Sequence, residues 1–179
     1  MKIPLESLER QAKSVRNFDS PPLELWNPPL SGDIPIQINA QGHWYHDGSK
    51  IERQSLVKLF ASILRREEDG EYYLLTPSEK WRIEVERHPL SIVDFDVLID
   101  DGVPSLMATL NIDRQVLVGD DYPLFLDSTV GDIVGVKMPH GITALCSRSA
   151  WIRLVGLATD INGTMVVSSG VYTFSLGAG

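Results

Sequence analysis

Apolar positions recur at the spacing of an amphipathic helix in three stretches of the chain. The pattern predicts helices over residues 3–16, 52–66 and 148–158, because apolar side chains every three or four residues line one helix face. In the second stretch, Arg65 and Arg66 would then lie in the last turn, where the helix dipole favours cations.

A proline-rich segment follows the first predicted helix. The prolines of residues 19–29 exclude a helix, since each removes an amide donor and pushes the preceding residue into an extended conformation. We expect an extended strap whose Leu25 and Trp26 pack onto the body of the protein. The alternative is that the same side chains dock a partner.

Most of the remaining chain alternates apolar and polar positions, which is the period of a half-buried strand. Asp-Gly and Asn-Gly pairs separate several of these stretches and favour tight turns. The predicted strands are residues 34–38, 43–46, 72–76, 81–86, 92–99, 106–112, 115–118, 134–137, 165–167 and 171–176. Together with the three helices they predict an α+β fold.

The chain also shows an internal similarity. Residues 53–60 lie over residues 148–155 at an offset of 95, with an arginine and a leucine identical, and each stretch is followed by strand, turn and strand. We therefore expect two related subdomains, each a helix packed on antiparallel strands. The predicted segments are an N-terminal helix and strap over 1–33, a first subdomain over 34–90 and a second over 91–179.

Composition and charge narrow the function classes. Of 179 residues, 43% are hydrophobic and 22% charged, and no apolar run approaches the ~20 residues of a membrane span. The net charge of −8 argues against a nucleic-acid-binding protein. It equals the balance of residues 94–132, where nine aspartates face one arginine; turn chemistry explains this acidic band, and a cation site is the alternative. The single Cys146 and the absence of a secretory signal predict a cytoplasmic protein.

One region carries specific motifs. Residues 20–86 contain Pro21-Pro22-x-Glu24-x-Trp26-Asn27-Pro28, Gly42-x-Trp44-x-His46-x-Gly48-x-x-Ile51-x-Arg53-x-x-Leu56-Val57-x-Leu59-Phe60-Ala61 and Gly70-x-Tyr72-x-Leu74-x-Thr76-Pro77-x-Glu79-Lys80-x-x-Ile83-x-Val85. This region resembles the bacterial family known as domain of unknown function 1285, and the rest of the chain resembles it more loosely. The resemblance implies an α+β fold of two small subdomains built on repeated motifs, no assigned activity and a suggested role in signalling. The family's recurrent positions correspond to Trp44, His46, Arg53, Thr76, Glu79 and Lys80.

Two arginines begin predicted helices, where the helix dipole disfavours a cation by ~0.3–1 kcal/mol. Arg53 and Arg148 therefore need a nearby anion. One interpretation is a salt bridge to an acidic group such as Glu79 or Glu84, and the other is a binding site for an anionic ligand.

Two further constellations have weak chemical signals. His43-x-x-His46-Asp47 could hold a metal, but strand positions three apart point to opposite faces. Cys146 with His140 could form a nucleophile and base, but its apolar neighbours favour a buried, inert thiol. The chain has no nucleotide-binding, hydrolase or zinc-protease motif, so we predict no metal, cofactor or catalytic residue.

These observations lead to a hypothesis about function. We expect a non-enzymatic binding or regulatory module, with a possible signalling role, that recognises a protein partner or a small anionic ligand. The candidate groove residues are Trp44, His46, Arg53, Thr76, Glu79, Lys80 and Arg148. The alternative is a hydrolase or transferase with His46 and Glu79 as an acid–base pair. A third possibility, a purely structural subunit, requires a large exposed apolar patch.

Overall fold

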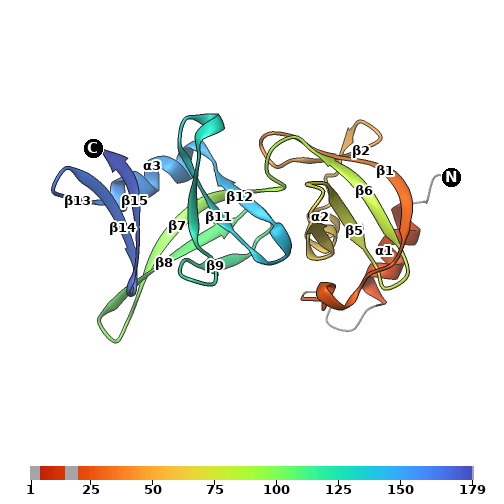
Figure 1. Cartoon of the computed structure of the whole chain (residues 1–179), viewed down its shortest axis with the longest axis horizontal. Helices are drawn as coiled ribbons and strands as arrows, with labels where there is room; N and C mark the ends of the chain where they lie inside the picture. Colours follow the sequence, from red (N-terminus) through yellow and green to blue (C-terminus); the bar gives the residue numbers. More distant parts are fainter. Residues whose placement is uncertain (1–4, 15–19, 179) are drawn as a thin grey trace. The chain divides into compact units, whose positions relative to one another are not determined.

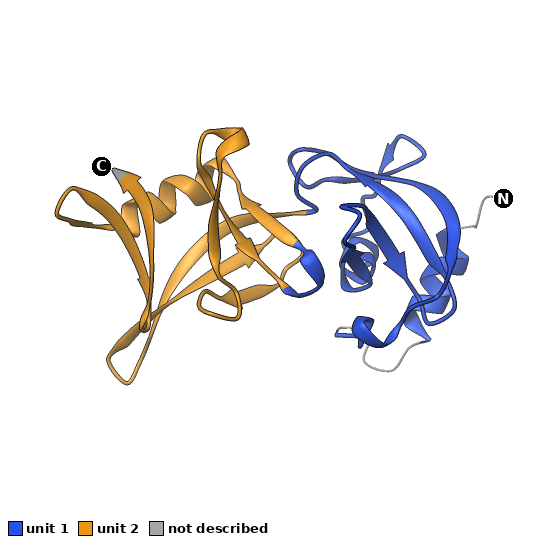
Figure 2. Cartoon of the chain, in the orientation of Figure 1, with its two compact units in different colours: residues 1–89, 139–142 blue, residues 90–138, 143–179 orange. Residues whose placement is uncertain are grey.

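The computed structural model describes residues 5–14 and 20–178 and divides the chain into two compact units (Figure 2). The units are Met1–Pro89 with Pro139–Ile142, called unit 1, and Leu90–Met138 with Thr143–Gly179, called unit 2. Both units combine helices with sheets, so the expectation of an α+β fold is confirmed (Figure 1). Within the described ranges, no helix is long and apolar enough to cross a membrane.

Unit 1 contains a six-stranded sheet in the order β3-β2-β1-β6-β5-β4. The strands are β1 (Leu30–Ile38), β2 (Trp44–His46), β3 (Ser49–Lys50), β4 (Leu64–Arg66), β5 (Tyr72–Leu75) and β6 (Lys80–Val85). All neighbours are antiparallel except β1 and β6, which are parallel. The sheet therefore consists of two three-stranded antiparallel halves that are joined at its centre by one parallel pair.

Two helices belong to unit 1, α1 (Leu5–Lys13) and α2 (Gln54–Ser62). Leu8 and Ala12 of α1 are fully buried, and α2 lies inside the curve of the sheet (Figure 1). The second predicted helix ends earlier than expected, because residues 64–66 form β4 and pair with β5. The buried apolar pair Ile63–Leu64 fits the spacing of a helix as well as that of a strand. The hydrogen bonds of β4 with β5 select the strand. The predicted first helix extends at both ends beyond the described residues.

The two faces of the unit 1 sheet differ in polarity. Along β1, Ile34, Ile36 and Ile38 are at most 4% exposed, while the intervening side chains are exposed. In β6, Trp81 and Ile83 point to the same buried side. The sheet thus has an inner face toward the core and an outer face that carries the alternate, mostly polar positions.

Pro35 lies where the central parallel pair is irregular. Asp33 pairs with Arg82 and Gln37 with Glu84, so β1 advances four residues while β6 advances two. Proline cannot donate a ladder hydrogen bond, and it is tolerated within sheets at such bulges. The two extra residues of β1 therefore interrupt the regular pairing with β6 at this point.

The proline-rich strap contains a short 3-10 helix, η1 (Leu23–Leu25). Leu23 and Trp26 are only 1% and 8% exposed, so the expected packing of Trp26 is confirmed. The expectation for Leu25 was wrong, because its side chain is 74% exposed. The tight turn of η1 rotates Leu23, instead of Leu25, toward the body.

Unit 2 contains a second six-stranded sheet, in the order β10-β11-β12-β7-β8-β9, and a separate three-stranded sheet, β13-β14-β15. Its elements are β7 (Leu90–Asp100), β8 (Val103–Leu110), β9 (Gln115–Leu117), β10 (Leu124–Asp127), η2 (Ser128–Val130), β11 (Ile133–Lys137), β12 (Thr143–Cys146), α3 (Arg148–Leu157), β13 (Thr159–Ile161), β14 (Thr164–Ser169) and β15 (Tyr172–Ala178). The residues of η3 (Pro139–Gly141) belong to unit 1. In helix α3, Ala150 and Leu154 are fully buried, but Ile152 of the predicted apolar stripe is 62% exposed.

The two six-stranded sheets share one topology. Numbered from its own first strand, each has the order 3-2-1-6-5-4, and its first and sixth strands form a parallel pair. Helix α2 precedes the fourth strand of its sheet, whereas α3 follows the sixth strand of the other. The offset of 95 residues inferred from the sequence therefore does not align equivalent strands of the two sheets. It aligned two helices that share an apolar spacing but occupy different positions in the strand order.

Two leucines of the strap provide a matched test of its packing. Leu23→Ala should lower the free energy of unfolding of unit 1 by about 2–4 kcal/mol, since it empties a fully buried site. Leu25→Ala should change it by less than about 0.5 kcal/mol. Urea denaturation followed by tryptophan fluorescence measures both. Equal effects of the two substitutions would contradict this packing.

Candidate functional site

The outer face of the unit 1 sheet carries cross-strand polar pairs on its central strands. The Arg82 guanidinium donates two hydrogen bonds to the Asp33 carboxylate, at 2.8 and 3.1 Å. One step further along, the Gln37 amide donates to Glu84 Oε2 at 2.7 Å. Tyr45 of β2 pairs with Gln37 in register and so lies on the same face. The strand register thus aligns these polar groups in rows across the sheet.

Two depressions lie on this outer face, each open to solvent. The first, called the Tyr45 depression, has a volume of about 560 Å³ and is lined among others by Gln37, Tyr45, Glu84 and Glu86. The second, called the Pro35 depression, has a volume of about 590 Å³ and lies over the irregular pairing of β1 and β6. Gln37 and Glu84 border both depressions, which are therefore adjacent.

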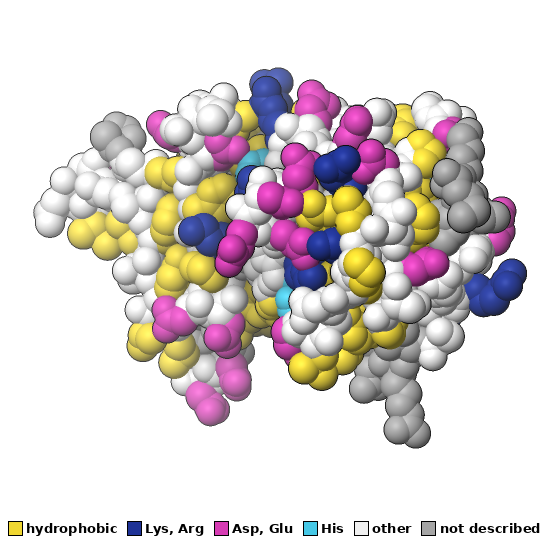
Figure 3. Space-filling view, turned by 45° about the vertical axis from the view of Figure 1, so that its right-hand side comes forward, with side chains coloured by type: hydrophobic (Ala, Val, Ile, Leu, Met, Phe, Trp, Pro, Cys, Tyr) yellow, Lys and Arg dark blue, Asp and Glu magenta, His cyan; other side chains and the backbone are white. Residues whose placement is uncertain are grey.

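The Tyr45 depression is acidic. Of the described residues that line it, none is lysine or arginine, while Glu84 and Glu86 contribute carboxylates. The Glu86 carboxylate also accepts a hydrogen bond from the Ala40 amide at 2.9 Å, which holds it beside the β1–β2 turn. The surface that Figure 3 presents has acidic and basic side chains interspersed among apolar ones.

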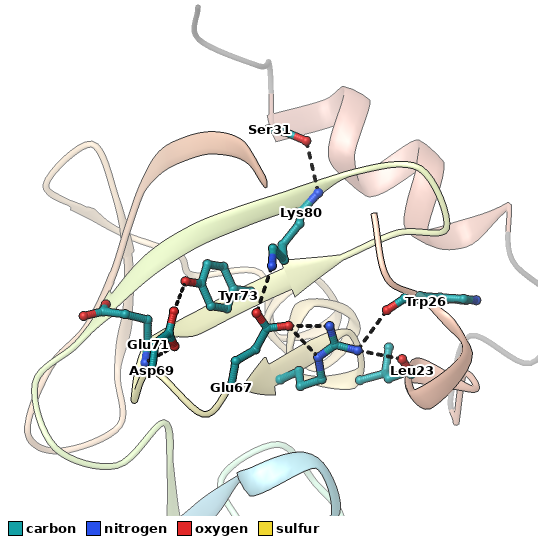
Figure 4. A network of polar contacts seen from close by, with 9 residues as sticks. Leu23, Trp26, Ser31, Glu67, Asp69, Glu71, Tyr73 and Lys80 are labelled. Carbon is teal, nitrogen blue, oxygen red and sulfur yellow. Dashed lines mark hydrogen bonds and ion pairs between the residues drawn. The ribbon is translucent and has the colours of Figure 1, made fainter. Parts of the chain in front are cut away.

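A polar network occupies the β4–β5–β6 end of the outer face (Figure 4). The Glu67 carboxylate accepts hydrogen bonds from Lys80 Nζ at 2.8 Å and from the Arg65 guanidinium. Arg65 also donates to the carbonyl oxygens of Leu23 and Trp26, each at 2.9 Å. Because Arg65 points outward from β4, these bonds hold the strap on the outer face.

The network shifts the pKa of Glu67 and of the neighbouring Tyr73. Burial opposes ionisation of Glu67, but hydrogen bonds from Lys80 and Arg65 outweigh it and hold the pKa of that carboxyl below its usual range. Tyr73, whose ring lies 4.7 Å from Lys80 Nζ, donates to Asp69 at 2.6 Å. That hydrogen bond, together with burial, raises the pKa of Tyr73 to about 12. The network is therefore anionic at both carboxylates near neutral pH.

The residues selected from the sequence have separate structural partners. The Trp44 indole is buried and donates to the Pro89 carbonyl at 3.3 Å. His46 Nε2 lies 3.7 Å from the Asp47 carboxylate. Arg53 forms an ion pair with Glu9 of α1 at 2.5 Å, which is the salt-bridge alternative with a partner other than the suggested Glu79 or Glu84. The reason is that α1 packs against α2, which brings Glu9 to the start of that helix.

The turn before β6 is also held by hydrogen bonds within unit 1. Thr76 is 1% exposed, and its hydroxyl accepts from the Glu79 amide at 3.0 Å and contacts the Gln11 side chain of α1 at 3.3 Å. The Glu79 carboxylate accepts from the Trp81 indole at 3.1 Å. This arrangement is that of a capped tight turn.

The proposed acid–base pair does not converge. His46 pairs with Ile36 of β1, while Lys80, the neighbour of Glu79, pairs with Leu30 toward the other end of the same strand. At about 3.3 Å per residue, these two positions are roughly 20 Å apart. Arg148 is an exposed residue at the start of α3 in unit 2. Of the seven selected residues, only Lys80 takes part in the outer-face network.

Sequence reasoning missed the residues that build the outer face. Gln37, Tyr45, Glu84 and Arg65 lie in different strands, and their neighbourhood depends on strand order and register. The alternation along β1 and β6 did contain a usable signal, because it separates Asp33, Pro35 and Gln37 from the buried isoleucines. In the part of the chain that the structure describes, no group of three or more His, Cys, Asp or Glu side chains could hold a metal ion.

The pH dependence of the free energy of unfolding tests the role of Glu67. Its folded-state pKa lies below the usual 4.5, so the ionised carboxylate stabilises unit 1 above that pH, and this contribution is lost as the pH falls through the folded-state pKa. Glu67→Gln should lower the free energy of unfolding by about 1–2 kcal/mol at pH 7, with the difference from the unsubstituted protein narrowing as the pH falls. Urea titrations at several pH values measure it. The exposed neighbour substitution Glu68→Gln should leave the profile unchanged; a difference that persists undiminished in acid would contradict the assignment.

Cys146 provides a test of the thiol. Burial raises the pKa of the Cys146 thiol to about 12, so the thiolate is scarce at pH 8. A thiol-reactive disulfide reagent should therefore label the native protein slowly and label one thiol per chain in denaturant. Rapid labelling of the native protein would instead indicate an activated cysteine.

Comparison with known proteins agrees with this architecture. Residues 21–88 match the family model described as domain of unknown function (DUF1285), N-terminal domain. A crystal structure of a DUF1285 family protein from Silicibacter pomeroyi DSS-3 is 32% identical, with a TM-score of 0.83 over 96% of this chain and 94% of that one. A DUF1285 family protein from Shewanella baltica OS155 is 30% identical, with a TM-score of 0.56 over 69% of this chain and 91% of that one. No curated protein matches significantly. The chain belongs to the DUF1285 family.

Proposed function

We propose that this protein is a non-enzymatic binding module, with a regulatory or signalling role, that recognises a protein partner through the outer face of its unit 1 sheet. The observation that carries the proposal is the pair of adjacent depressions over β1 and β6. They are open to solvent, and their lining includes charged and amide side chains of the sheet, which suits a surface that another protein recognises. Enclosed apolar pockets, by contrast, are typical of small-molecule sites.

The ion pairs favour a protein partner over a small anionic ligand. Arg82 is paired with Asp33, Lys80 with Glu67, and Arg53 with Glu9. An anion would have to displace a carboxylate from each of these cations, and the displaced carboxylate would lose its charged hydrogen bonds. The arrangement therefore supports the protein-binding form of the hypothesis.

The cellular setting is part of the same proposal. The chain contains one cysteine, which is a buried free thiol, and this supports a reducing compartment such as the cytoplasm. A regulatory partner would then be another protein of that compartment.

Site-specific photo-crosslinking in the source organism tests the binding surface. A photoreactive amino acid at Gln37 or Tyr45 should give a discrete adduct with one partner protein, because both residues line the Tyr45 depression. The same amino acid at Leu117 or Ile152 of unit 2, which are 50% and 62% exposed, should give no such adduct.

Reversal of one charge provides the second arm of this experiment. Arg82→Glu places a carboxylate against Asp33 on the outer face and should change the yield of the Gln37 adduct if the partner contacts this surface. The proposal is overturned if the control positions crosslink the same protein equally well, or if neither outer-face position crosslinks any protein.

A further inference from the structure

We infer that the Tyr45 depression receives a positively charged side chain, lysine or arginine, from an extended basic segment of the partner protein. This inference rests on the proposed function and specifies its partner. It combines three observations: the cavity itself, the acceptors in its wall and an aromatic ring beside them.

The acceptors come from two carboxylates that the fold holds in place. Glu84 Oε2 is occupied by the Gln37 amide, and Glu86 Oε2 is occupied by the Ala40 amide. Each carboxylate keeps its second oxygen and further lone pairs for another donor. Two carboxylates at alternate positions of β6 and its extension are suited to the several N–H donors of an ammonium or a guanidinium group.

The aromatic ring adds selectivity for this chemistry. Tyr45 lies on the outer face of β2 and lines the same depression. A guanidinium can stack on a tyrosine ring, and the methylene stem of a lysine can lie along it. A neutral polar side chain would interact less strongly than lysine or arginine with both the ring and the carboxylates.

The adjacent Pro35 depression favours an extended segment over a free amine. It shares Gln37 and Glu84 with the first depression and adds the carboxylate of Glu71. Its cation, Arg82, is engaged with Asp33. A partner segment lying across both depressions could therefore place one basic side chain in each.

A nearby cation offers a variant with the opposite expected effect. Lys50 of β3 pairs with Tyr45 in register but does not line the depression. Its positive charge opposes a cationic ligand across the strand pair. Lys50→Gln should therefore strengthen binding under the same mechanism that makes carboxylate removal weaken it.

Binding of a defined peptide to the full-length protein tests the inference. The probe is a fluorescein-labelled octapeptide of alternating arginine and serine, measured by fluorescence anisotropy, with a second peptide in which citrulline replaces every arginine. We expect Glu84→Gln and Glu86→Gln each to weaken arginine-peptide binding about 3- to 10-fold, and salt to weaken it further. Glu68→Gln, which removes an exposed carboxylate elsewhere, should have no effect.

The outcomes separate the inference from the proposed function. The inference is overturned if the citrulline peptide binds as well as the arginine peptide, if the arginine peptide does not bind, or if Glu84→Gln and Glu86→Gln behave like Glu68→Gln. Should that happen while the Tyr45 crosslink persists, the binding surface stands and only the partner's chemistry is wrong. Loss of the crosslink at both outer-face positions removes the proposed function itself. If a glutamate variant folds poorly, Lys50→Gln still tests the inference, because it should strengthen binding of the arginine peptide.

Discussion

The parallel pairing of β1 with β6 is the interaction on which unit 1 depends. It joins two antiparallel halves whose strands are distant in sequence, and its register decides which side chains face the core. The irregularity at Pro35 lies inside this pair, and the Pro35 depression lies over it. A shift of register by one residue would bury Asp33 and Gln37 and expose the isoleucines.

Unit 2 uses the same strand order without the same surface. Its parallel pair, β12 with β7, also joins two antiparallel halves, but the helix of this unit follows the sheet instead of interrupting it. Apolar side chains such as Leu98, Ile99 and Val103 are about half exposed or more along its long hairpin. The shared topology therefore sets the frame of each unit, while the outward-facing residues of the strands give each its own surface chemistry.

The sequence predicted local structure better than the site. Alternation along Ile34, Ile36 and Ile38 identified a strand and its buried face, because that signal needs only neighbours in the chain. The predicted end of the second helix was wrong. Ile63 and Leu64 fit the apolar pattern of a helix or of a strand, and the pairing of β4 with β5 selects the strand. The four-residue strands β10 and β12 were not predicted. The network of Arg65, Glu67 and Lys80 could not be predicted, because it forms only when β4, β5 and β6 lie in register.

The attachment of the strap has a consequence for how unit 1 opens. Its carbonyl groups at Leu23 and Trp26 are held by a guanidinium whose own charge is balanced by Glu67. Once that carboxylate takes up a proton, Arg65 and Lys80 lie near each other without their shared counterion, and their repulsion acts directly beneath the strap. We expect the strap to detach as a sub-global opening event in acid, at a pH below 4.5, visible as fast amide hydrogen exchange around η1, while the sheet ladders stay protected.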